Sequence, residues 1–275
     1  MAEAARAPRH IYPQLPSARD FLDRTGDAEL KARADIDRLK PTIKARIGAM
    51  DWERIPRDLD DNGYALTGAV LTPDECSALI ALYPERERFR SRVDMVRLRY
   101  GNGEYKYFAR PLPELVEELR IALYQRLAPI ANHWSKLLDD AEPYPASLTA
   151  FVKECAVHGQ ARPTPLLLRY QAGGYNCLHQ DLYGDIAFPL QFTCVLSRRE
   201  RDFSGGEFLL VEQRPRAQSR GEAISLDLGE AIIFTNRYRP MRGVRGHYRV
   251  NVRHGVSTLR TGERYALGII FHDAK

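Results

Sequence analysis

The sequence predicts an α+β protein whose core is a double-stranded β-helix (jelly roll), with an N-terminal helical layer packed on one face. Two observations predict this fold. The first half of the 275-residue chain carries apolar residues at helical spacing. From residue 165 onward, short alternating segments are separated by glycine-rich turns, as is typical of a jelly roll. We therefore predict a helical extension at 1–55 and a domain at 56–275, helical to about residue 160 and with its jelly-roll core at 165–271.

The individual elements follow from local signals. Thr72-Pro-Asp-Glu75 is a capping box with proline at the first helical position, which predicts a helix to about Leu82. Tyr100-Gly-Asn-Gly103 is typical of a hairpin turn. Further helices are predicted at 18–48, 113–138 and 146–157. Strands are predicted at 64–70, 89–100, 165–170, 189–197, 207–212, 223–227, 230–235, 248–257 and 264–271.

The last two predicted strands, read as 249–258 and 264–271, are expected to form a hairpin. An odd-length connection at 259–263 would place His254 and Arg264 on the same face, because side chains alternate along a strand. Small residues share the face of Arg264 and leave room beside it, namely Ala266 and Gly268. Larger residues are expected to pack on the opposite face, namely Leu267, Ile269 and Phe271.

The segment His179-Gln-Asp181, taken with His254, has the composition of a metal site. Two histidines and one carboxylate can occupy one face of an octahedral ion and leave the other face open, as in non-haem Fe(II) oxygenases. His247 competes with His254 for the third position, but only His254 has an arginine, Arg264, ten residues after it. We therefore predict His179, Asp181 and His254 as the metal ligands.

The residues around this triad extend the pattern. Tyr170 stands nine residues before His179, with Gly173-Gly174 between them. This spacing resembles the Tyr…Gly-Gly…His-x-Asp segment of the prolyl-4-hydroxylase-like branch of the Fe(II)/2-oxoglutarate dioxygenases. Three further segments resemble the same superfamily: 253–267, Gly205-Gly206-Glu207 and Gly229–Phe234. The resemblance covers about residues 165–271. More narrowly, 178–185 and 188–191 resemble a bacterial oxygenase family grouped with AlkB-type nucleic-acid repair enzymes.

The resemblance implies an enzyme that uses Fe(II), 2-oxoglutarate and O2, with ascorbate as a candidate reductant. It implies that Arg264 holds the far carboxylate of 2-oxoglutarate and that Tyr170 donates a hydrogen bond to it. The implied activity is hydroxylation or oxidative demethylation of an alkylated base in a nucleic acid. Two alternatives remain: a protein or amino-acid hydroxylase, which the spacing of His254 and Arg264 favours, and a non-catalytic jelly-roll binding module.

Basic residues cluster in two segments of a chain whose net charge is +5. Residues 237–254 contain six arginines and no acid. This run leads directly to His254, so we expect it near the mouth of the site. Residues 86–110 interleave basic with aromatic residues. Such surfaces suit a phosphate backbone and unstacked bases, so DNA or RNA is the predicted partner. The alternatives are a basic rim for a small anion, including 2-oxoglutarate itself, and an ordinary surface. The predicted substrate contacts are Arg242, Arg245, His247, Tyr105 and Tyr107.

Composition limits the remaining classes. Apolar residues make up 44% and charged residues 28% of the chain, as in ordinary soluble proteins. No apolar run approaches the ~20 residues of a membrane span, and the first residues lack the apolar core of a signal peptide. The four cysteines show no paired spacing, so no disulfide is expected. These features predict a cytoplasmic protein without an obligate protein partner.

Overall fold

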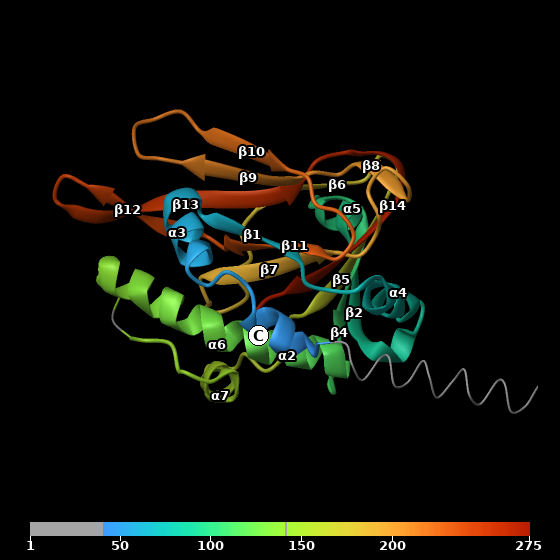
Figure 1. Ribbon diagram of the computed structural model, residues 1–275, viewed down its shortest axis with the longest axis horizontal. Helices are drawn as coiled ribbons and strands as arrows, with labels where there is room; N and C mark the ends of the chain where they lie inside the picture. The colour runs from blue at the N-terminus through green and yellow to red at the C-terminus, as the bar shows by residue number, and fades with distance from the viewer. Residues whose placement is uncertain (1–40, 141) are drawn as a thin grey trace, which may run out of the picture. The chain divides into compact units, whose positions relative to one another are not determined.

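Two β-sheets and a group of helices make up the part of the chain that the computed structural model describes, residues 41–140 and 142–275 (Figure 1). Residues 43–275 belong to one compact unit. Most of the predicted extension at 1–55 lies outside the described residues, so its boundary stays a prediction. The helices are α2 (Ile43–Gly48), α3 (Arg54–Asn62), α4 (Pro73–Ala81), the short 3-10 helix η1 (Arg86–Arg88), α5 (Met95–Leu98), α6 (Glu114–Leu137) and α7 (Leu148–Val157).

The larger sheet has eight strands in the order β1-β11-β7-β14-β5-β4-β2, with β8 paired to β14. Its strands are β1 (Tyr64–Ala69), β2 (Phe89–Asp94), β4 (Glu104–Phe108), β5 (Leu166–Gln171), β7 (Leu190–Val195), β8 (Phe203–Gly205), β11 (Glu230–Thr235) and β14 (Leu259–Ile269). The smaller sheet has six strands in the order β10-β9-β13-β6-β3, with β12 paired to β13. Its strands are β3 (Gly101–Asn102), β6 (Tyr175–His179), β9 (Phe208–Gln213), β10 (Arg220–Ile224), β12 (Tyr238–Gly243) and β13 (Gly246–Val256). These strands pair antiparallel, and the prediction of an α+β protein is confirmed.

The two faces of the larger sheet bury different sets of side chains. One face packs against the helices and forms the main core, which includes Phe192. It also includes the residues predicted to pack on the face opposite Arg264, namely Leu267, Ile269 and Phe271. The other face and the smaller sheet share a second cluster, which includes Tyr170, Phe208, Phe234 and Val252. The space that carries the predicted site therefore lies between two sheets rather than beneath a helix. None of the described helices is long and apolar enough to cross a membrane.

Two local features match the sequence closely. The capping box at the start of α4 is confirmed, because the Thr72 hydroxyl accepts from the Glu75 amide at 3.2 Å and the Glu75 carboxylate accepts from the Thr72 amide at 2.8 Å. All four cysteines are free, with Cys177 exposed and the other three buried.

The predicted hairpin between the last two strands is wrong. β13 belongs to the smaller sheet and β14 to the larger one, so the chain crosses between the sheets at Ser257 and Thr258. β14 also begins earlier than predicted, because Leu259 to Gly262 pair with β8. Burying one face of each strand requires two facing sheets here, and a local alternation pattern does not reveal which strands are neighbours.

The strand predicted at 89–100 ends early. The Asp94 carboxylate accepts a hydrogen bond from the Val96 amide and caps α5, so β2 stops at Asp94. The predicted tight turn at 100–103 is wrong, because α5 and β3 together connect β2 with its antiparallel partner β4. Five strands were not predicted from the sequence: β3, β4, β6, β8 and β12.

A buried ion pair fixes the C-terminal segment to α6. Arg120 is 1% exposed and donates to the Asp273 carboxylate at 2.7 Å and to the Phe271 carbonyl at 2.7 Å. Arg110 reaches the other carboxylate oxygen of Asp273 at 2.6 Å. The end of the chain is therefore part of the core under β14.

We expect Asp273→Ala to lower the free energy of unfolding by about 3–5 kcal/mol, because the Arg120 guanidinium would stay buried without its carboxylate. Chemical denaturation measures this change. The double variant Arg120→Met with Asp273→Leu should recover most of the loss. Asp185→Ala, which removes an exposed carboxylate paired with Lys275, serves as the control. A loss no larger than that of Asp185→Ala would contradict the role of the buried pair.

Candidate functional site

The two predicted histidine ligands are directly opposite each other on neighbouring strands. His179 ends β6, His254 lies in β13, and the two residues pair across the smaller sheet. Their rings lie 4.3 Å apart, centroid to centroid. Asp181 follows β6 by two residues and is buried below the same face. Residues 75 positions apart in the sequence thus meet as a cross-strand pair.

Local sequence features hold this arrangement. The register between β6 and β13 shifts after His254, at Gly255. A Cβ at Gly255 would lie 2.7 Å from the Asn176 carbonyl oxygen, so only glycine permits this close approach. Gln180 donates to the carbonyl oxygens of Val252 at 2.8 Å and Arg237 at 3.0 Å. The residue between the two ligands is thereby tied to β13.

The three side chains have the separations that a single ion requires. Nε2 of His254 lies 3.2 Å from Asp181 Oδ2, and Nε2 of His179 lies 3.5 Å from Asp181 Oδ1. One ligand atom from each residue lies within 4.8 Å of the others. Adjacent positions on an octahedral ion with bonds near 2.1 Å are about 3 Å apart, so the donor set fits Fe(II).

Hydrogen bonds behind the triad orient its donor atoms. The Cys177 carbonyl lies 2.7 Å from His179 Nδ1, and a carbonyl can only accept. The proton therefore sits on Nδ1 of His179, and Nε2 keeps its lone pair for a metal. The Tyr183 hydroxyl donates to Asp181 Oδ1 at 2.6 Å. Such outer partners fix the orientation of a ligand.

The protonation states of Asp181 and His254 suit metal binding. Burial lowers the pKa of His254, and the neighbouring His179 lowers it further. Burial acts to raise the pKa of Asp181, but the adjacent imidazoles of His179 and His254 outweigh it and hold the pKa well below its usual value. Asp181 is thus an anion and His254 a neutral imidazole, the forms in which both bind metals.

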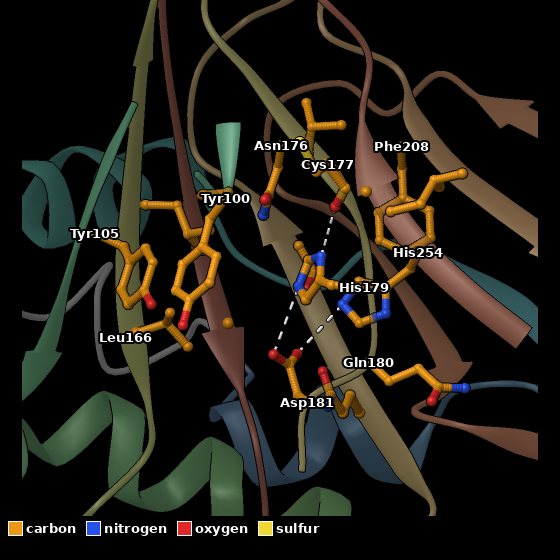
Figure 2. A pocket seen from close by; sticks show the side chains of 18 of the residues that line it. Tyr100, Tyr105, Leu166, Asn176, Cys177, His179, Gln180, Asp181, Phe208 and His254 are labelled. Carbon is orange, nitrogen blue, oxygen red and sulfur yellow. Dashed lines mark hydrogen bonds and ion pairs between the residues drawn. The ribbon is translucent and has the colours of Figure 1, made fainter. Parts of the chain in front are cut away.

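A cavity of about 470 Å³ opens from the triad between the two sheets (Figure 2). This volume is typical of a small-molecule site. In Figure 2, Tyr100 and Tyr105 lie on one side of Asp181, and His254 lies on the other. The larger sheet contributes Arg264, Ala266 and Gly268, so the predicted small residues beside Arg264 do line the site.

Arg264 is a buried cation that has no acidic partner among the described residues. It is 2% exposed, its Nε lacks a hydrogen-bond partner in the described chain, and it pairs with Tyr170 across β14 and β5. The Tyr170 hydroxyl is also buried and has no hydrogen-bond partner within 41–140 and 142–275, and burial raises its pKa, so it remains a donor. An unpaired buried charge is costly. The two groups therefore fit an anionic ligand in this cavity, as the far carboxylate of 2-oxoglutarate would be.

Among the polar residues that line the cavity and were not predicted as site residues, two lie on the same strand of the larger sheet. Gln191 and Thr193 lie on β7, and Nε2 of Gln191 is buried without a partner among the described residues. Thr193 lies opposite Gly268 on β14. Their signal was present in the sequence, because two polar residues at spacing two interrupt the apolar strand 190–195.

The predicted substrate contacts separate into two groups. Tyr105 lines the cavity. Tyr107 is buried behind it, 5.4 Å from the Tyr105 ring and edge-on to it. The remaining three predicted contacts do not line the cavity: Arg242, Arg245 and His247.

Those three residues lie at the tip of the β12–β13 hairpin. His247 pairs with Arg242 there and is seven residues, or about 23 Å of extended strand, from His254. Within the same run, Arg239 forms a buried ion pair with Glu212 at 2.7 Å. The prediction that this whole run lies at the mouth of the site is therefore wrong, and a role of its tip in substrate binding stays a prediction.

Comparison with known proteins matches residues 103–274 to a family described as "Oxygenase, catalysing oxidative methylation of damaged DNA". Two uncharacterized proteins of Mycobacterium tuberculosis, from strains CDC 1551 / Oshkosh and ATCC 25618 / H37Rv, are each 53% identical over 167 residues, covering 61% of this chain and 72% of theirs.

Two solved structures resemble the fold. The first is a Pseudomonas putida prolyl-4-hydroxylase (15% identity, TM-score 0.49, 82% of this chain and 99% of that one). The second is a Burkholderia pseudomallei oxidoreductase of the 2OG-Fe(II) oxygenase family (15% identity, TM-score 0.49, 82% and 94%).

The family match spans more than half of the chain and contains the triad, Tyr170 and Arg264. The donor set of the cavity fits Fe(II), and its unpaired arginine fits the carboxylate of 2-oxoglutarate. The chain therefore belongs to this family of oxygenases, within the superfamily of enzymes that use Fe(II), 2-oxoglutarate and O2.

Proposed function

We propose that this oxygenase hydroxylates an alkyl group on a damaged base of DNA or RNA. His179, Asp181 and His254 are its metal ligands, and Arg264 and Tyr170 bind the far carboxylate of 2-oxoglutarate. The observation that carries the proposal is a buried arginine without an acidic partner among the described residues, in the same cavity as the triad. When bound, Fe(II) couples the oxidative decarboxylation of 2-oxoglutarate to succinate and CO2 with insertion of an oxygen atom into a C–H bond.

The described residues bind and orient the reactants. Arg264 presents a planar fork that can pair with a carboxylate through two hydrogen bonds, and Tyr170 adds a third donor. Gln191 and Thr193 line the same cavity and are available to the cosubstrate. Tyr183 donates a hydrogen bond to Asp181 and would hold the carboxylate in one orientation toward a bound metal ion.

A nucleic-acid substrate is supported by the mouth of the cavity and by the description of the family. Arg99 and Tyr100 line the cavity, and Leu178 and Leu182 are exposed there. An exposed tyrosine with apolar neighbours suits a flat base, and a cation suits its phosphate. A base in a duplex would first have to leave the stack to enter. Hydroxylation of an N-alkyl carbon would release an aldehyde and restore the base.

The proposal includes the fold that carries the site. We infer that the two facing antiparallel sheets form a double-stranded β-helix. The triad on the smaller sheet and Arg264 on the larger sheet line one space between them, which supports this arrangement.

A second candidate is a protein or amino-acid hydroxylase. It is favoured by the ten-residue spacing from His254 to Arg264, which resembles the prolyl-hydroxylase branch. A non-catalytic binding module is the third candidate, and the intact triad stands against it.

Succinate release separates these candidates. We expect Fe(II)-loaded protein with 2-oxoglutarate to form more succinate with N-alkylated oligonucleotides than with unmodified ones, and to release one aldehyde per succinate formed above the background. Proline-containing peptides should leave the background unchanged. Stimulation by peptides alone would establish the second candidate. No succinate above the metal-free blank under any condition would establish the binding module.

A further inference from the structure

A second cleft, of about 800 Å³, lies on the opposite face of the larger sheet from the triad cavity. Strand alternation establishes the opposite faces. On β5, Tyr170 lines the triad cavity whereas Arg169 lines the cleft. On β14, Arg264 and Tyr265 divide in the same way. The cleft lies between the end of α4 and the edge of the sheet at β2 and β4, a region labelled on the right of Figure 1.

The lining of this cleft is strongly basic. It contains one carboxylate, Glu104, and five basic side chains: Arg86, Arg90, Arg92, Lys106 and Arg169. Glu104 is already shared, because it pairs with Arg92 and, at 3.4 Å, with Arg169, and it accepts from the Tyr83 hydroxyl at 2.9 Å. The side chain of Arg86 is exposed and has no acidic partner among the described residues. Arg169 also pairs at 2.6 Å with Glu263, which lies outside the lining. Three cations of the lining have no acidic partner among the described residues, namely Arg86, Arg90 and Lys106, so the cleft carries an excess of positive charge.

Aromatic rings hold the central cation of the cleft in place. The Lys106 ammonium lies 4.3 Å from the centroid of the Tyr83 ring and 5.3 Å from that of Phe89, and it donates to the Tyr83 carbonyl at 2.7 Å. Burial lowers the pKa of Lys106, and the nearby arginines, including Arg92 and Arg169, lower it further. An anion bound in the cleft would relieve this repulsion.

Basic residues continue from this cleft to the mouth of the triad cavity. Arg92 is shared with a smaller hollow that also contains Arg97, Leu98 and Asp94, and the exposed Arg97 lies 3.5 Å from the Asp94 carboxylate. This hollow lies over β2, the edge strand of the sheet, and the start of the connection through α5. Arg99 and Tyr100 follow directly and line the triad cavity. Cations at several successive points match a polymer with repeated phosphates better than a single small anion.

We infer that the cleft is a phosphate-binding site separate from the triad cavity. It holds the backbone that flanks the damaged nucleotide, while that nucleotide enters the triad cavity. The strand would pass from the cleft around the edge at β2 and across α5 to the mouth. This inference rests on the proposed function and adds a route for the strand outside the catalytic cavity. It also places substrate contacts on β2, η1 and α5, at the end of the unit opposite the tip of the β12–β13 hairpin (Figure 1).

The double variant Arg86→Glu with Arg97→Glu tests the route, because both side chains are exposed and neither lines the triad cavity. We expect its affinity for an alkylated single strand of about 12 nucleotides, within known single-strand site sizes, to fall about tenfold or more. The slope of log K against log salt should flatten by about 0.7 for each phosphate that the variant no longer neutralises. Fluorescence anisotropy measures both. Uncoupled succinate formation and the KM for an alkylated mononucleotide should not change.

The matched control is Arg57→Glu with Lys153→Glu, which changes the net charge equally at exposed positions on α3 and α7. Equal weakening by test and control variants would show a non-specific charge effect and overturn the inference, as would unchanged binding by the test variant while alkylated strands are still turned over. Absence of binding and turnover with every oligonucleotide would overturn the proposed function and the inference with it. The route would be established if only the test variant lost affinity for the oligonucleotide while its KM for the alkylated mononucleotide stayed unchanged.

Discussion

Replacement of Asp181 by alanine is expected to weaken Fe(II) binding by at least about 10²-fold, because loss of an outer hydrogen-bond partner alone costs about 10–100-fold. Asp181 supplies the only carboxylate of the triad, and both histidines face it at 3.2–3.5 Å. Uncoupled conversion of 2-oxoglutarate to succinate should fall to the metal-free background. Anaerobic calorimetry with Fe(II), and succinate release in a separate assay, measure the two effects.

Two neighbouring residues provide the controls for this substitution. Asp185→Ala removes an exposed carboxylate four residues away, paired with Lys275, and should bind Fe(II) normally. Tyr183→Phe removes only the hydrogen bond to Asp181. Its Fe(II) affinity should lie between those of Asp185→Ala and Asp181→Ala, about tenfold weaker than that of the unchanged protein. If Asp181→Ala binds Fe(II) as tightly as Asp185→Ala does, Asp181 is not a ligand and the metal site is assigned wrongly.

Arg264→Ala is expected to raise the KM for 2-oxoglutarate about 10²-fold, because removing one partner of a buried charge pair typically costs 2–5 kcal/mol. Arg264→Lys keeps the charge but loses the two-pronged geometry, so its effect should be smaller and still clear. Steady-state succinate formation at varied 2-oxoglutarate concentrations measures both. Fe(II) affinity without 2-oxoglutarate should not change, since Arg264 lies on the other sheet from the triad.

The same substitution distinguishes a ligand-binding arginine from a structural one. Arg264 is buried without an acidic partner among the described residues, so its charge costs stability in the ligand-free protein. Arg264→Ala should therefore keep or raise the Tm of the free protein and remove the rise in Tm that 2-oxoglutarate produces. Arg260→Ala, an exposed change on β14, is the control. A lower Tm in the free protein with an unchanged KM would show that Arg264 only supports the fold.

The donors of the site could be predicted because they depend on local spacing. A metal ligand set needs particular side chains, and His179 and Asp181 stand two residues apart, on one side of an extended segment. The capping box of α4 was predictable for the same reason, since its hydrogen bonds span only three residues. Where an interaction is local, residue type and spacing determine it.

The sequence predicted two basic segments, 86–110 and 237–254, but not which of them contributes to the cavity. The run at 237–254 has six arginines, yet one of them, Arg239, is buried against Glu212 from another strand. Arg99, a single cation in the connection after α5, reaches the cavity instead. Charge density along a sequence does not reveal which charges are neutralised by distant partners.

The sequence by itself determined the candidate chemistry: two histidines and a carboxylate that can hold Fe(II), an arginine that can bind an oxoacid, and an α+β chain to carry them. Only the tertiary structure decided that His254 and Arg264 face each other from different sheets, and that Gln191 and Thr193 join them. The reason is that alternation specifies which side chains share a face of one strand, whereas the choice of neighbouring strand depends on burying two sheets against each other.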